Sequence, residues 1–201
     1  MKLACIAATT ALTLATAFPA LADRIPLSEL SDYLNGIGTA EASFTQISED
    51  GAIATGTLYL HRPGRMRFEY DEDDLLVMAG GGQVAIFDGR ANSRPEQYPL
   101  RRTPLNLILG RNIDLDQSSM ILSHEEDESA TRVVAQDPED PEIGTIELVF
   151  TGDPVELRQW VVTDSTEFRT TVILGGLEEG VDIPSRYFNI PLELRDRGLS
   201  D

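Results

Sequence analysis

Cysteine, lysine and histidine are nearly absent from this chain of 201 residues, which holds one cysteine (Cys5), one lysine (Lys2) and two histidines (His61 and His124). A single cysteine excludes an internal disulfide and a zinc site built from several thiolates. Two histidines exclude a multi-histidine metal site, and the lone lysine leaves none for chemistry in the body of the chain. We therefore expect neither a bound metal nor a cofactor.

Basic residues are scarce as a whole, since 16 lysines and arginines stand against 34 acidic residues and give a net charge of −18. Nucleic-acid binding requires a basic face, and passive adhesion to anionic lipid requires clustered basic residues. The charge balance argues against both. A composition of 41% hydrophobic and 25% charged residues is too apolar for a disordered chain and too polar for a membrane protein.

Catalytic motifs are also missing. No Gly-x-Ser-x-Gly elbow is present, and the glycines 80–82 are not followed by the Lys-Ser/Thr pair of a phosphate loop, so they indicate a hairpin turn. The acidic runs 71–74 and 125–128 lack the glycine-centred spacing of a calcium loop and indicate solvated loops. A catalytic pair of carboxylates stays open, but no pair is singled out. We predict no catalytic residues and no enzyme activity.

The N-terminal 22 residues have the layout of a secretory signal peptide. Lys2 precedes a mostly apolar run at 3–18, and Pro19 is followed by the small-residue site Ala20-Leu21-Ala22. The alternative, an anchor helix, needs about 20 apolar residues, and the run is shorter. We expect cleavage after Ala22, which leaves residues 23–201 as a single exported domain of 179 residues. It would have a net charge of −19 and no cysteine to carry a lipid anchor.

Hydrophobic periodicity predicts a mainly β domain with small helices. Leucines and isoleucines at 27, 30, 34 and 37 form one face of a helix, and a second helical piece is expected at 104–110. Alternation on both sides of Pro63-Gly64 predicts a hairpin, and another brackets the glycines 80–82. Further strands are expected at about 120–123, 131–136, 145–151, 155–163 and 168–174. About nine antiparallel strands should curl into a barrel or half-barrel, with the stripes 27–37 and 105–109 covering one face or mouth.

Arg62 has an ambiguous position. Alternation places it on the same face as Leu58 and Leu60, and a charged side chain on an apolar face requires partners. One interpretation is that its guanidinium binds backbone carbonyls of a helix that lies over the sheet. The other is that Arg62 sits at the strand end beside Pro63 and reaches solvent. The sequence pattern alone favours neither.

Four segments resemble a known family: residues 42–46, the Gly-x-Leu-x-x-x-Arg-Pro-x-x-x-x-Phe stretch at 56–68, residues 97–100 and residues 103–105. With the signal peptide and the first helix, their order resembles the periplasmic outer-membrane lipoprotein carrier protein family, LolA. The resemblance is strongest over residues 40–110 and loose over 183–201. It implies an unclosed (half) antiparallel β-barrel with a small α-helical lid. Its apolar cavity would shield lipoprotein acyl chains between the inner and outer membranes.

The resemblance also implies roles for individual residues. Arg62 matches the arginine that ties the lid to the barrel. The positions expected to line the acyl-chain cavity are Leu58, Leu60, Met66, Phe68 and Tyr70 on the sheet and Leu105, Ile108 and Leu109 on the lid. A positive rim for docking partners is a further expectation, with ordinary surface charge balance as the alternative; its members would be Arg65, Arg67, Arg101, Arg102 and Arg111.

The implied partners are triacylated lipoproteins as cargo, an inner-membrane lipoprotein-releasing ABC transporter and a LolB-like outer-membrane acceptor. LolB itself shares the fold but carries a lipidated N-terminal cysteine, which the expected mature chain lacks. We expect a monomer in the periplasm. The alternative function is a periplasmic binding or sensor module of the same fold, with a glycolipid or another apolar molecule as its ligand.

Overall fold

The computed structural model describes residues 24–199, apart from 73, 92, 117–118 and 128. The predicted signal peptide at 1–22 and its cleavage site lie outside these residues. Twelve strands form one antiparallel sheet: β1 Thr39–Ser48, β2 Ile53–His61, β3 Arg65–Tyr70, β4 Leu75–Gly80, β5 Gln83–Asp88, β6 Glu96–Pro99, β7 Ile121–Asp127, β8 Ala130–Gln136, β9 Gly144–Thr151, β10 Glu156–Asp164, β11 Arg169–Leu174 and β12 Glu178–Glu179.

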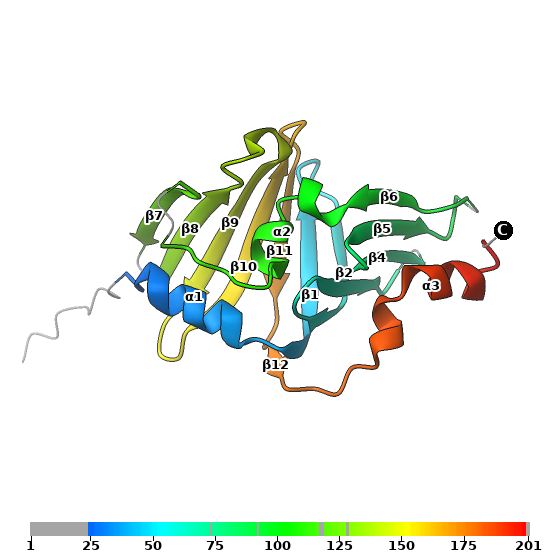
Figure 1. Cartoon of the computed structure of the whole chain (residues 1–201), viewed down its shortest axis with the longest axis horizontal. Helices are drawn as coiled ribbons and strands as arrows, with labels where there is room; N and C mark the ends of the chain where they lie inside the picture. The colour runs from blue at the N-terminus through cyan, green and yellow to red at the C-terminus, as the bar shows by residue number, and fades with distance from the viewer. Residues whose placement is uncertain (1–23, 73, 92, 117–118, 128, 200–201) are drawn as a thin grey trace, which may run out of the picture.

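The sheet consists of two meanders joined side by side, in the order β6-β5-β4-β3-β2-β1-β11-β10-β9-β8-β7, with β12 paired to β1. The end strands β6 and β7 do not pair with each other in the described part of the chain, so the sheet curls without closing (Figure 1). The predicted mainly β, unclosed antiparallel fold is confirmed. The expected count of about nine strands was too low, because the short strands β6 and β12 have no apolar alternation.

The helices are short: α1 Leu27–Gly36, α2 Asn106–Leu109 and α3 Ile190–Asp196, with 3-10 turns η1 Leu100–Arg102, η2 Pro141–Ile143 and η3 Ser185–Phe188. In Figure 1, α1 and α2 lie over the same face of the sheet, as the apolar stripes predicted. Leu30 and Leu34 of α1 are buried in the main core. Tyr33 contacts the Phe150 ring edge-on at 6.1 Å, and its hydroxyl accepts a hydrogen bond from the Leu157 amide at 3.1 Å.

The opposite, outer face of β4 and β5 is covered by the C-terminal part of the chain, where no element was expected. A second apolar cluster forms there from Leu76, Met78, Ala85 and Phe87 of the sheet and Ile190 of α3. The helix α3 begins at a capping residue, since the Asn189 side chain accepts a hydrogen bond from the Leu192 amide at 2.9 Å. The C-terminal segment therefore covers the outer face at β4 and β5, and the lid helices α1 and α2 lie on the other face of the sheet.

Candidate functional site

Arg62 follows β2 at the turn to β3 and points to the same face as Leu58 and Leu60. Its residue exposure is only 9%. One Nη donates a hydrogen bond to the Leu34 carbonyl, and the other donates to the Gly110 carbonyl at 2.7 Å and to Asn35 Oδ1 at 3.4 Å. The interpretation that Arg62 reaches solvent is therefore wrong.

The two carbonyls belong to different pieces of chain. Leu34 lies in the last turn of α1, and Gly110 follows α2 directly. The last turn of α1 has no basic residue of its own, so the Arg62 guanidinium supplies the positive charge that the carbonyl end of a helix favours. Burial lowers the pKa of Arg62, but an arginine stays protonated in proteins. One side chain thus joins two separate elements through charge-assisted hydrogen bonds.

These two elements form one cover, which we call the lid and define as α1 together with residues 103–115. The Asn35 side chain forms two hydrogen bonds with the Ile113 backbone. Its Nδ2 donates to the Ile113 carbonyl at 2.7 Å, and its Oδ1 accepts from the Ile113 amide at 2.9 Å. Ser31 Oγ accepts a hydrogen bond from the Leu115 amide at 2.9 Å. The lid also contacts the β2–β3 turn, where the Gly64 amide donates to the Leu109 carbonyl at 2.9 Å.

An apolar cavity of about 20 Å³ lies between the lid and the sheet. Five of the eight residues expected to line an acyl-chain cavity line it, together with Arg62: Leu58, Leu60, Met66, Ile108 and Leu109. Six further lining residues were not predicted: Leu34, Ile37, Leu157, Trp160, Leu174 and Leu177. Leu34 and Ile37 belong to the apolar stripe of the first helix, which was the signal available for them.

The other three expected cavity residues, Phe68, Tyr70 and Leu105, do not line this space but pack into the same core. The Phe68 ring contacts Phe44 at 4.9 Å and Trp160 at 6.1 Å between centroids. Burial raises the pKa of Tyr70 to about 12, and its hydroxyl donates to Gln46 Oε1 at 2.6 Å. This aromatic cluster continues the apolar face away from the lid.

The cavity volume sets a limit on what the site can hold in this conformation. About 20 Å³ is roughly the space that one water molecule occupies, and any acyl chain is far larger. The lid would have to move for such a chain to enter. The contacts between the lid and the β2–β3 turn are hydrogen bonds and apolar packing.

The expected positive rim is only partly assembled. Arg101, Arg102 and Arg111 are exposed, whereas Arg65 is half-buried and its Nε donates to the His61 carbonyl at 3.2 Å. Arg67 does not lie on an open rim, because alternation turns it to the outer face of the sheet. There its side chain is 12% exposed and forms ion pairs with Glu69 and Glu193.

Among the described residues, no group of three or more His, Cys, Asp or Glu side chains is placed to hold a metal ion, and no helix has the length and apolarity needed to span a membrane.

Comparison with known proteins points to one family. The family model for the outer membrane lipoprotein carrier protein LolA matches residues 35–191. A Pseudomonas paraeruginosa outer-membrane lipoprotein carrier protein is 24% identical over 192 residues, covering 90% of this chain and 91% of the relative. One from Methylococcus capsulatus is 31% identical over 77 residues, 35% of this chain and 37% of the relative. A LolA superfamily structure from Nitrosomonas europaea aligns with a TM-score of 0.44 at 7% identity, covering 82% of this chain and 98% of that one.

Proposed function

The chain belongs to the outer membrane lipoprotein carrier protein LolA family, and on that premise we propose that it shields lipoprotein acyl chains and carries them through the periplasm from the inner to the outer membrane. The observation that carries the proposal is the lid, a cover that Arg62 joins to an apolar face. A carrier needs such a face, because each acyl methylene removed from water gains about 0.8 kcal/mol.

Release requires a state that competes with the bound cargo. When the lid lies on the sheet, the lid residues Ile108 and Leu109 occupy the apolar face themselves. Hydrogen bonds from a charged group contribute about 1.5–3 kcal/mol each, so the Arg62 contacts favour this closed conformation. The net free energy of cargo binding is then the free energy gained by burying the acyl chains minus that lost when the lid opens. This small difference keeps binding reversible. In this proposal, Arg62 is the lid latch.

The same proposal includes the surroundings of the carrier. The cargo would be triacylated lipoproteins, delivered by an inner-membrane ABC transporter and received by a LolB-like acceptor. The exposed Arg101, Arg102 and Arg111, with Arg65, would form the docking rim, and the chain would act as a monomer. Cleavage after Ala22 would leave residues 23–201 as the working domain, without a cofactor.

The test is to identify what the chain binds. The full chain is expressed with its export signal in a lipoprotein-producing Gram-negative host, purified without detergent and analysed by native mass spectrometry. We expect an intact triacylated protein at one copy per carrier. Free glycolipid would instead support the binding-module alternative, and purified protein that takes up no lipoprotein even from a reconstituted transporter would overturn the carrier function.

A further inference from the structure

The β2–β3 hairpin contacts two different segments of the chain, one on each face. Leu60, Arg62 and Met66 face the lid, whereas Tyr59, His61 and Arg67 alternate to the outer side. The outer side is contacted by residues 185–199, which we call the C-terminal clasp. His61 and Arg62 are adjacent in sequence, so a displacement of one moves the other.

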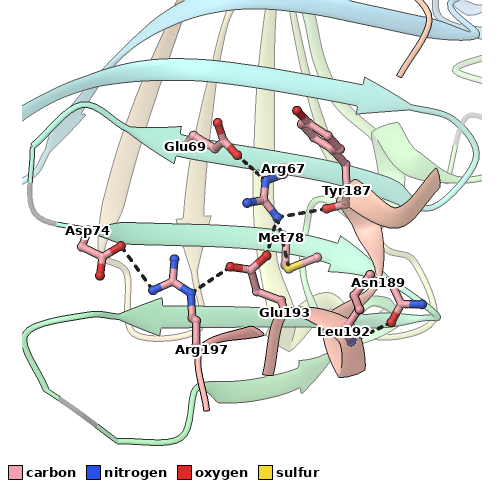
Figure 2. Close-up of polar contacts among 9 residues, drawn as sticks. All are labelled: Arg67, Glu69, Asp74, Met78, Tyr187, Asn189, Leu192, Glu193 and Arg197. Carbon is pink, nitrogen blue, oxygen red and sulfur yellow. Dashed lines mark hydrogen bonds and ion pairs between the residues drawn. The ribbon is translucent and has the colours of Figure 1, made fainter. Parts of the chain in front are cut away.

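The contacts between the clasp and the hairpin are close and specific. The Phe188 ring, 4% exposed, meets the His61 ring edge-on at 5.8 Å, and Tyr187 meets Tyr59 at 5.4 Å. Figure 2 shows Arg67 pointing at the clasp, where its Nη1 donates to the Tyr187 carbonyl at 3.1 Å and to Glu193 at 3.0 Å.

The clasp is itself anchored to the next strands, so it can act as a support. Arg197 joins Glu193 at 2.8 Å and Asp74 at 3.3 Å (Figure 2). The backbone of Phe188 passes so close to Gly80 of β4 that a Cβ on that glycine would collide with the Phe188 carbonyl. The support therefore spans from β4 to the end of β2.

We infer that Phe188, Tyr187 and Glu193 are positioning residues for the Arg62 latch: by holding the outer side of the β2–β3 hairpin, the clasp keeps the Arg62 guanidinium within reach of the lid carbonyls. The inference rests on the proposed role of Arg62. It makes the clasp a second place from which lid opening is controlled, because whatever loosens the clasp weakens the latch without touching the cavity.

Hydrogen exchange tests this coupling in the full-length mature chain without cargo. Amides of Gly64, Leu109 and Ile113 report the lid, and the Leu148 amide in β9 reports global unfolding. In Phe188→Ala we expect the lid amides to exchange roughly threefold to tenfold faster, which lies within the range of coupling through packed side chains. Arg195→Ala is the matched control, because Arg195 lies on α3 with an exposed side chain paired to Asp196, and it should leave the lid amides unchanged.

A double-variant comparison separates positioning from general loosening. In an Arg62→Leu background, Phe188→Ala should add no further acceleration at the lid, since the latch it positions is already gone. Phe188→Leu replaces Phe188→Ala if the latter does not fold. Unchanged lid exchange with accelerated clasp amides, or additive acceleration in the double variant, would overturn the inference. If Arg62→Leu alone leaves the exchange of the lid amides unchanged, the proposed latch role of Arg62 is wrong. The experiment thus distinguishes a wrong latch role from a wrong positioning role of the clasp.

Discussion

The two faces of the β2–β3 hairpin are covered in different ways. On the inner face, the Arg62 guanidinium binds neutral carbonyls of the lid, and an apolar cavity remains beside it. On the outer face, arginines pair with carboxylates, aromatic rings stack edge-on and a glycine admits the clasp backbone. On the inner face, an apolar ligand can replace the apolar packing but not the Arg62 hydrogen bonds. The outer face adds ion pairs between arginines and carboxylates to its aromatic packing.

The largest effect is expected from a charged substitution in the apolar inner face of the sheet. Phe68 is 5% exposed among Phe44, Tyr70 and Trp160, so Phe68→Glu buries an unpaired carboxylate at a cost of several kcal/mol, on the order of an effective desolvation penalty. We expect loss of acyl binding together with a lower free energy of unfolding, measured by cargo loading and by urea denaturation. Full loading by a folded Phe68→Glu protein would contradict the proposal that this face receives the acyl chains.

The second prediction removes the latch and leaves the apolar face. Arg62→Leu deletes hydrogen bonds worth about 1.5–3 kcal/mol each, which should shift the lid towards opening by about tenfold or more. The variant should load lipoprotein and transfer it poorly to an acceptor, and Arg62→Lys should fall between, because an ammonium lacks the planar fork. Arg158→Leu, an exposed arginine paired with Glu156, is the control. Transfer by Arg62→Leu at the wild-type rate would exclude the latch.

The third prediction acts on the outer face through packing. Gly80→Ala places a methyl group against the Phe188 carbonyl, a backbone atom that cannot rotate away. Overpacking of this kind costs about 1–3 kcal/mol, and we expect lower stability and faster exchange of clasp amides. Gly36→Ala is a suitable control, because a Cβ there meets nothing within 4 Å. Equal stabilities of the two variants would show that the clasp does not require this close approach.

The two smallest expected effects concern the stability of the clasp contacts as the pH falls. Burial, followed by the charge of Arg65, lowers the pKa of His61, so the fold favours the neutral ring over the protonated one. A lowered folded-state pKa means that stability falls as pH drops below the ordinary histidine pKa of about 6.5. The nuclear Overhauser effect between the His61 and Phe188 rings should weaken from pH 7.5 to 5.5. In the control variant His61→Gln, the chemical shifts of the clasp amides should stay constant over that pH range. If the nuclear Overhauser effect in the wild type does not change with pH, the prediction is wrong.

Glu193 adds a second acid step at lower pH. Burial raises its pKa, but hydrogen bonds from Arg197 and Arg67 outweigh this and lower it below the usual value. The contribution of ionised Glu193 to stability is complete above the ordinary glutamate pKa of about 4.3. It is lost as the pH falls through the lowered pKa that Glu193 has in the fold. Glu193→Gln should remove this step in an acid titration of clasp exchange, and a step that persists in the variant would assign it to another group.

The sequence predicted what depends on local periodicity. Alternation across Pro63-Gly64 correctly placed Leu58, Leu60 and Met66 on one face, and the spacing of Leu30 and Leu34 predicted the helix that covers it. What it could not supply were contacts between distant segments. Trp160 lines the cavity from the other meander, and neither its strand order nor its neighbours can be read from a local pattern.

Arg67 shows where local reasoning stopped short. Its parity, opposite to Phe68, was available in the sequence and already separated it from the cavity face. Its cover was not, because Glu193 lies 126 residues further on in a seven-residue helix with too few turns for a clear periodic signal. The partners of Arg67 thus lie in a segment whose helix the sequence pattern did not predict.

The order of the strands has a consequence for how the chain folds. β1 to β6 form a meander of neighbouring hairpins, but α1, which precedes them in the chain, packs against Phe150 and Leu157 of β9 and β10. Tyr33 of α1 therefore meets these partners only after residues more than a hundred positions later have been synthesised and paired. Long-range contacts of this kind slow folding, so the packing of the lid helix against the second meander is a slow step to expect in the folding of this chain.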